Sequence, residues 1–162
     1  MFDRVLKALI HSKNEAADDV LLEALRLGNE REQGFALDAL IQRQTHRGLG
    51  GVTRLFEDLP PSIQDEVIRQ VRAFHHALLQ SGRSDDLAER FGAMQIIARA
   101  RQGKLSYVLS ENMHQPDEAL SKAAVEAIVG LAQWVAEETY RLQRWEAKPA
   151  AGQWKSEAGS RT

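Results

Sequence analysis

The chain has 162 residues, 27% of them charged, and a formal net charge of −2 at neutral pH. That length suffices for one domain with a sizeable core, and the balanced charge argues against a dedicated nucleic-acid or membrane-surface module, which usually carries a basic excess. The absence of cysteine excludes disulfides, thiolate nucleophiles and cysteine-based metal sites, and it fits a reducing compartment. The amino-terminal residues do not resemble a signal peptide and we identify no apolar run near membrane-span length, so we expect a cytoplasmic protein.

Three helices are expected in the first part of the chain. Apolar residues recur at helical spacing over residues 2–11, which predicts a short amphipathic helix. An acidic first turn and a strongly apolar run that stops at Gly28 predict a second helix. Asn29 with Glu32 three residues on is typical of a capping box and predicts a third helix. Because at most two residues separate the second and third helices, we expect them to pack as an antiparallel pair.

Turn signals separate the helices in the middle of the chain. A short helix from Leu49 is expected to end before the prolines at positions 60 and 61, which cannot continue it. The apolar period then runs over residues 62–80 and predicts one helix, opened by Ser62 with Asp65. A further helix over residues 84–102 carries Gly92 as a small contact residue.

The last part of the chain is expected to hold a short helix and a long one. The short helix covers residues 104–113, and Pro116 at a first helical position opens a closing helix that runs to about Trp145. Residues 147–162 are rich in Ala, Gly, Ser and charge and are expected to be disordered. Residues 1–146 are therefore expected to form one all-α domain of seven or eight helices without strands.

The apolar face of each expected helix gives a predicted core. We expect its members to be Leu22, Leu25, Phe35, Leu40, Leu55, Val67, Val71, Phe91, Met94, Ile97, Val108, Leu120, Ala124 and Ile128.

Two helices share a pattern of small residues. Ala36 and Ala39-Leu40 in the third helix correspond to Ala124 and Ala127-Ile128 in the last. This pattern resembles the B helix of HEAT repeats, in which small residues let neighbouring helices lie close together. The resemblance implies a short right-handed α-solenoid of antiparallel helix pairs, with A helices outside and B helices inside, that binds a partner protein along its inner surface.

The match to HEAT repeats has departures. The arginine that such repeats usually carry early in helix B is replaced by Gln33 and Ser121. Armadillo-like or irregular helical arrays therefore remain as alternatives.

Residues that could carry chemistry each have a simpler structural explanation. The glycines at 48, 50 and 51 match no phosphate-binding motif, and we interpret them as a loose turn between repeats. His75 and His76 are adjacent on a helix and point about 100° apart, so they do not face one metal ion. The paired carboxylates lie in first turns, where the helix dipole stabilises negative charge. We expect no catalytic residue, no metal site and no cofactor.

A candidate binding surface follows from helical spacing. If residues 62–80 form one helix with Val67 and Val71 buried, then Arg69, Arg72 and His76 lie on its solvent side, and the following helix adds Gln95 and Arg99. Such a surface suits an acidic or extended peptide, because arginine forms directional bonds to carboxylates. The alternative is an ordinary solvated charged face.

The closing helix is expected to extend beyond the helices that pack against it. Leu131, Val135, Leu142 and Trp145 continue its apolar face, and we expect Leu142 and Trp145 to contact either another copy, a downstream segment or the chain's own domain.

Three functional classes follow. The first is a non-catalytic protein-interaction scaffold with an unidentified protein or peptide partner, and the third is a lyase-like or accessory HEAT protein. The second is a nucleic-acid-binding array, and the acidic residues interleaved with its basic cluster count against it. That basic cluster consists of Arg69, Arg72, Arg83, Arg90, Arg99, Arg101 and Lys104.

Overall fold

The computed structural model describes residues 2–146, and over these residues the protein is all-α with no strand. The expected tail, residues 147–162, lies outside the described residues. Nine α-helices and three short 3-10 helices are present in the described part, so the expected number of seven or eight is too small. Their bounds are α1 Phe2–His11, α2 Ala16–Leu27, α3 Glu30–Arg43, α4 His46–Leu55, η1 Phe56–Asp58, α5 Pro61–Arg69, η2 Val71–Phe74, α6 His75–Ser81, α7 Leu87–Arg99, η3 Gly103–Leu105, α8 Ser106–Met113 and α9 Glu118–Glu146.

The first pair of long helices forms as its caps predict. The Asn29 side chain accepts a hydrogen bond from the Glu32 backbone N–H at 3.1 Å, and the Glu32 carboxylate accepts one from the Asn29 N–H at 3.0 Å. This capping box satisfies two orphan donors at the start of α3. The connection through Gly28 and Asn29 is short, and α2 and α3 pack against each other.

Helix α4 begins earlier than expected, because Thr45 caps it by accepting a hydrogen bond from the Gly48 N–H at 3.1 Å. Its glycines are therefore inside a helix, and the interpretation as a loose turn is wrong. A Cβ atom at Gly51 would lie 2.4 Å from Cδ1 of Leu22 in α2, and one at Gly50 would lie 2.9 Å from Oε1 of Glu89 in α7. The glycines let two neighbouring helices approach the axis of α4 closely.

Residues 62–80 form two helices, and the predicted single helix is wrong. Pro60 is the N-cap of α5 and Pro61 its first helical residue, so Ser62 does not open it. At Gln70 the backbone leaves the helical conformation, and the chain continues through η2 into α6. The apolar period survives this break, because Val67, Val71, Phe74 and Leu78 are all buried. The turn lets α5 pack on α3 and α7 while α6 packs on α4 and α7.

Helices α7 and α9 have side-chain caps at their first turns. Asp86 caps α7 by accepting hydrogen bonds from the N–H groups of Ala88 and Glu89. Arg101 ends that helix in the left-handed conformation, with φ of 55°. Asp117 caps α9 by accepting from the Leu120 N–H at 2.8 Å, so Pro116 lies before the cap and not at the first helical position.

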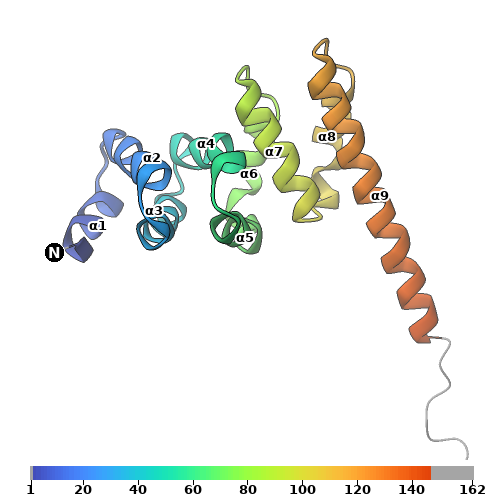
Figure 1. Ribbon diagram of the computed structural model, residues 1–162, viewed down its shortest axis with the longest axis horizontal. Helices are drawn as coiled ribbons and strands as arrows, with labels where there is room; N and C mark the ends of the chain where they lie inside the picture. The colour runs from blue at the N-terminus through green and yellow to red at the C-terminus, as the bar shows by residue number, and fades with distance from the viewer. Residues whose placement is uncertain (1, 147–162) are drawn as a thin grey trace, which may run out of the picture.

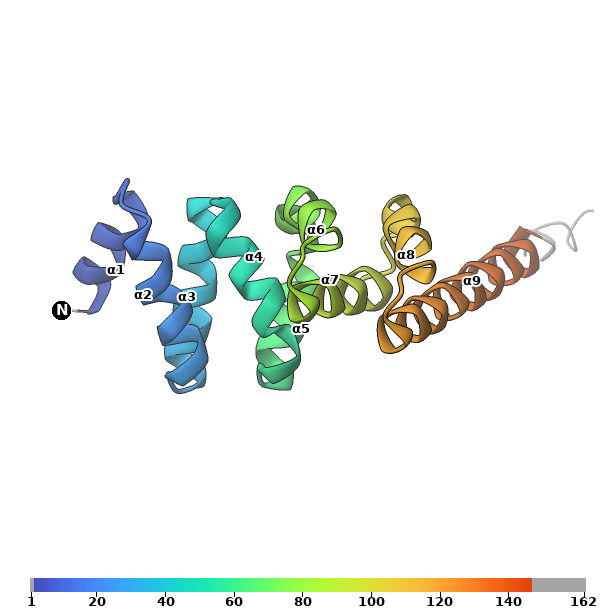
Figure 2. The same cartoon turned by 90° about the horizontal axis from the view of Figure 1, so that it is seen from above.

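The helices follow one another along the longest axis of the molecule, from α1 at one end to α9 at the other (Figure 1). Figure 2, turned by 90°, shows the same progression and the carboxyl-terminal half of α9 extending past α8. One apolar cluster runs through the array from α2 to α9.

Most of the predicted core is confirmed. Leu25, Leu40, Val67, Val71, Met94, Ile97, Val108, Leu120 and Ala124 are buried, and Leu22, Leu55, Phe91 and Ile128 pack half-buried against them. Phe35 is different, because it is half-buried outside the cluster and the Arg31 guanidinium lies over its ring at 5.5 Å. Among the described residues, the fully buried aromatic side chains are Phe56 and Phe74, and neither belongs to the predicted core.

Candidate functional site

The residues of the predicted binding surface lie on four elements. Arg69 is on α5, Arg72 in η2 and His76 on α6, because the expected single helix is broken. Gln95 and Arg99 lie one turn apart on α7. Four of the five side chains are exposed, and Gln95 is half-buried.

Arg99 is the most strongly positioned of these residues. Its guanidinium donates to the Gln64 side-chain oxygen at 2.6 Å and to the Asp65 carboxylate at 3.3 Å, both on α5. It also lies over the buried Phe56 ring, 5.4 Å from the ring centroid. Contacts with α5 and η1 thus fix its orientation, while two bonds leave further N–H groups of the guanidinium for another acceptor.

Gln95 and Arg99 form part of the rim of a groove between α7 and α9. The groove encloses about 230 Å³ and is lined by Phe91, Met94, Gln95, Ala98 and Arg99 of α7 and by Ala123, Glu126 and Ala127 of α9. Its floor is mainly apolar, and the space exists because Ala98, Ala123 and Ala127 carry only a methyl group. We call it the α7–α9 groove.

The chemistry of the α7–α9 groove suits a side chain or two of a peptide. Typical small-molecule and cofactor pockets enclose about 300–1,000 Å³, so this groove is smaller than most. An apolar floor would bury an aliphatic or aromatic side chain, while the amide of Gln95, the guanidinium of Arg99 and the carboxylate of Glu126 would orient polar groups at its edge.

His76 lies in a different hollow. This space of about 240 Å³ is lined by residues of the α3–α4 connection, α4, η2 and α6, among them His46 and His76. The two imidazoles come from separate helices. Within the described residues no group of three or more potential metal ligands gathers here or elsewhere.

The basic cluster in the middle of the chain is largely engaged by acidic or aromatic partners. Arg69 pairs with Glu66 at 2.6 Å, Arg83 with Glu111 at 2.7 Å, and Arg99 with Asp65. The hydrogen bond from Arg83 holds the pKa of the Glu111 carboxyl below its usual value. Such pairing reduces the positive potential that a nucleic-acid surface requires.

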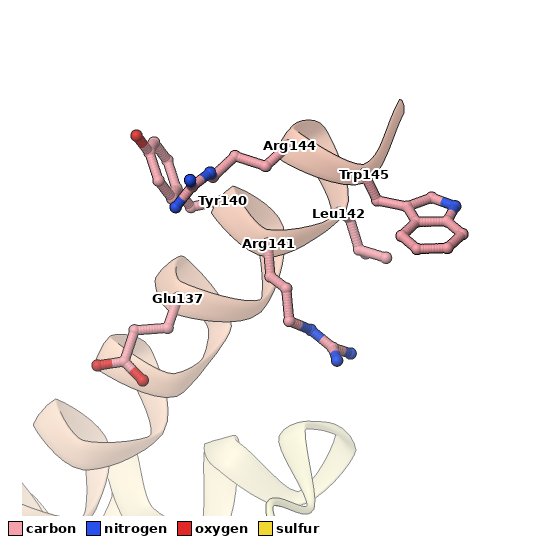
Figure 3. A pocket seen from close by; sticks show the side chains of 6 residues that line it. All are labelled: Glu137, Tyr140, Arg141, Leu142, Arg144 and Trp145. Atoms are coloured by element: carbon pink, nitrogen blue, oxygen red, sulfur yellow. The ribbon is translucent and has the colours of Figure 1, made fainter. Parts of the chain in front are cut away.

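A hollow of about 520 Å³ lies along the end of α9. Every described residue that lines it belongs to this one helix. Figure 3 shows Leu142 and Trp145 on one side of the helix and Tyr140 and Arg144 on the other, so these side chains do not converge on a ligand.

Helix α9 has the length and composition of a membrane-crossing segment. An 18-residue window within it reaches a mean hydropathy of 1.2 with at most two charged residues, which our sequence expectation overlooked. One such helix is weak support for a membrane location, because core helices of soluble proteins meet the same criterion. Here one face of α9 packs on α7 and α8.

Only some of the residues that line the α7–α9 groove were predicted from the sequence. Gln95 and Arg99 were predicted as binding residues, whereas Ala98, Ala123 and Glu126 were not. The signal that was present is the recurrence of alanine at positions 123 and 127, which places two small residues on one face of a helix. Of the two, only Ala127 was interpreted, as part of the small-residue pattern of close packing.

Comparisons with protein-family models, with curated proteins and with solved structures find no match to this chain. Its class is therefore defined by its own structure. Over the described residues it is an all-α protein whose helices are ordered along one axis and which has a groove between α7 and α9.

Proposed function

We propose that this protein is a non-catalytic interaction scaffold, built as a short HEAT-like α-solenoid, that holds a peptide segment of a partner protein in the α7–α9 groove. The observation that carries the proposal is the groove itself, with its apolar floor and its rim of Gln95, Arg99 and Glu126. Among the described residues we identify no comparable convergence of nucleophile, base and electrophile.

The solenoid part of the proposal rests on the order of the helices. Helices that are adjacent in the chain pack together, as α2 with α3 and α8 with α9 do. The array extends along one axis in both views (Figures 1 and 2). Small-angle X-ray scattering tests this arrangement, because a compact domain of this length has a radius of gyration of about 15 Å. We expect a clearly larger value, and a value at the compact limit would contradict a solenoid.

The partner segment is expected to combine one apolar side chain with a carboxylate. The apolar side chain would enter between Ala98 and Ala123, whose side chains are single methyl groups. The carboxylate would accept from the N–H groups of Arg99 that Gln64 and Asp65 leave free. A pre-oriented arginine loses little conformational entropy on binding, which favours Arg99 over Arg69, whose side chain is more exposed.

Selection from a displayed random peptide library, followed by fluorescence anisotropy, tests the groove. Ala123→Trp fills it, and Ala132→Trp places the same ring at an exposed position of the same helix as a matched control. We expect the first variant to lose the selected peptides and the second to bind them as the unmodified protein does. Circular dichroism verifies that both are folded.

Three outcomes would redirect the proposal. Equal binding to the Ala123→Trp variant would remove the groove as the binding site. If only the double variant Arg69→Glu and Arg72→Glu lost binding, the binding site would lie on the surface of α5 and η2. Binding of random-sequence DNA that falls steeply with salt would instead favour a nucleic-acid function.

A further inference from the structure

The carboxyl-terminal part of α9 presents an apolar stripe that nothing in the described structure covers. Ile128, Leu131, Val135, Leu142 and Trp145 recur at alternating spacings of three and four, with Glu138 at the remaining position of the series. This is the heptad pattern of a helix that packs against another helix along its length.

The same stripe is buried where α9 meets its neighbours and bare beyond them. Leu131 is buried, which corrects the expectation that it lies in the uncovered part, and Ile128 packs half-buried on the core. Val135, Leu142 and Trp145 are 47%, 53% and 76% exposed. We call residues 135–146 the overhang, a segment of about 18 Å at 1.5 Å per residue.

The overhang continues a packed helix but has no tertiary packing of its own in the described structure. Most helical stability in proteins comes from packing of an apolar face. The overhang also contains Val135, Thr139 and Tyr140, whose helix propensity is lower than that of Ala or Leu. A partner along the stripe would supply the missing packing.

The charges of the overhang are complementary to themselves in an antiparallel arrangement. Glu138 occupies the stripe and bonds Arg141 one turn on, which flanks it. In a parallel pair of overhangs, equivalent heptad positions face each other, so Glu138 would meet Glu138 of the other chain. In an antiparallel pair, the acidic residue of each chain lies beside Leu142 and Arg141 of the other.

We propose that the overhang is a dimerisation segment whose occupant is the overhang of a second copy of this chain, paired antiparallel about a two-fold axis near residue 140. Val135 of each chain then packs on Trp145 of the other, and Leu142 packs on the aliphatic stem of Glu138. Two Glu138 and two Arg141 side chains alternate around the axis. This charged central layer fixes the register, as polar residues within heptad seams do.

Sedimentation velocity of the full chain over a wide concentration range measures the dimer. Because the contact is short, we expect a reversible equilibrium. Leu142→Asp should weaken it at least about tenfold, equivalent to about 1.4 kcal/mol. Val129→Asp, on an exposed position of α9 outside the stripe, is the matched control and should leave the equilibrium unchanged. Neither side chain is buried in one copy, so circular dichroism should show both variants folded.

A charge exchange distinguishes self-pairing from binding of any other apolar partner. Glu138→Arg makes the central layer wholly basic and Arg141→Glu makes it wholly acidic, so each variant alone should fail to dimerise. An equimolar mixture of the two should form a heterodimer at least as tight as the original dimer, because opposite charges then face each other.

Cysteine pairs test the direction. The chain has no cysteine of its own, so single replacements report one position each. Val135→Cys mixed with Trp145→Cys should crosslink under mild oxidation, whereas either variant alone should not. Crosslinking of Trp145→Cys with itself would overturn the antiparallel arrangement.

Other occupants give different results. A chain that stays monomeric throughout the concentration range, with no heterodimer from the charge-exchanged mixture, overturns the proposal. Binding of the full chain to vesicles of neutral phosphatidylcholine that Leu142→Asp abolishes would identify a lipid surface as the occupant instead.

Discussion

The Arg43 side chain at the end of α3 is buried against Asp18 of α2. The guanidinium Nε donates to the Asp18 carboxylate at 2.6 Å, and the two side chains are 4% and 0% exposed. Arg43 also donates to the carbonyl oxygens of Leu9 and Ser12, at the end of α1 and just beyond it. One side chain therefore ties the first three helices together.

Removing Arg43 should destabilise the amino-terminal end strongly. Arg43→Met leaves the Asp18 carboxylate buried without its partner, and breaking a buried pair in this way costs about 3–5 kcal/mol. Urea unfolding should show this loss, and hydrogen exchange should show α1 opening first. Arg47→Met is the control, because its pairing with Asp19 is half exposed and such pairs contribute about 0–1 kcal/mol. Equal losses in the two variants would contradict the structural role of Arg43.

A methyl group at Gly92 should disrupt the contact between α4 and α7. A Cβ atom there would lie 1.9 Å from the backbone carbonyl oxygen of Thr53, which cannot move without shifting α4. Gly92→Ala is expected to cost at least the roughly 1–3 kcal/mol of an overpacked core. Gly130→Ala in α9 is the matched control, because nothing lies within 4 Å of its Cβ position. The control should stabilise the protein by about 0.5–1 kcal/mol, since alanine is the better helix former.

The two aromatic residues at positions 35 and 56 should differ when truncated. Phe56 is fully buried beneath Arg99, and Phe56→Ala should cost about 3–5 kcal/mol. Phe35 lies half-buried outside the core cluster, so Phe35→Ala should cost clearly less, although Phe35 and not Phe56 was in the predicted core. Thermal unfolding of the two variants measures the difference. A Phe35 variant that is the less stable of the two would place position 35 in the core after all.

Helix starts and ends that depend only on neighbouring residues could be predicted from the sequence. The capping box at Asn29 and the end of α2 at Gly28 needed only neighbouring residues, and both are confirmed. The break at Gln70 was missed because Val67, Val71, Phe74 and Leu78 keep their period through it. A short 3-10 segment turns the chain without changing which residues are apolar, so periodicity alone does not reveal it.

The candidate site depended on tertiary packing that the sequence does not encode locally. Arg99 was predicted as a solvent-facing residue, which it is, but its contacts with Gln64, Asp65 and Phe56 come from other elements. The groove beside it requires α9 to lie along α7 at a distance set by alanines on both helices. Pattern reasoning predicted small residues at that contact, and only the packed helices show that they leave a hollow.

Arg101 holds a backbone conformation that glycine would adopt more easily. It sits at φ of 55° after α7, where the Gln102 N–H donates to the Ile97 carbonyl at 3.0 Å. Its guanidinium lies 5.1 Å from the Trp134 ring centroid on α9. Arg101→Ala should lose about 0.5–1 kcal/mol of cation–π stabilisation, while the backbone strain of the positive φ angle remains. Arg101→Gly should exceed the alanine variant in stability by up to about 1 kcal/mol. An alanine variant as stable as the unmodified protein in urea would mean that the ring contact contributes nothing.

The Glu111 carboxyl should titrate below its usual range, because Arg83 hydrogen-bonds its charged form and attracts it electrostatically. A carboxyl whose pKa is lower in the folded than in the unfolded state contributes stability above the unfolded pKa, near 4.3, and that contribution disappears as the pH falls through the folded pKa. Arg83→Gln should therefore destabilise the protein slightly at neutral pH and not at strongly acidic pH, where both forms carry a neutral Glu111.

Carbon-detected NMR titration of the glutamate carboxyls measures the shift, and Arg83→Gln should raise the pKa of Glu111. The pKa of Glu23 is also lowered, but by Arg26, so it should stay unchanged in this variant. Both side chains of the Arg83–Glu111 pair are about half exposed, so 1 M salt should shrink the shift of Glu111 toward zero. A Glu111 pKa that does not move when Arg83 is replaced would mean that this pair does not persist in solution.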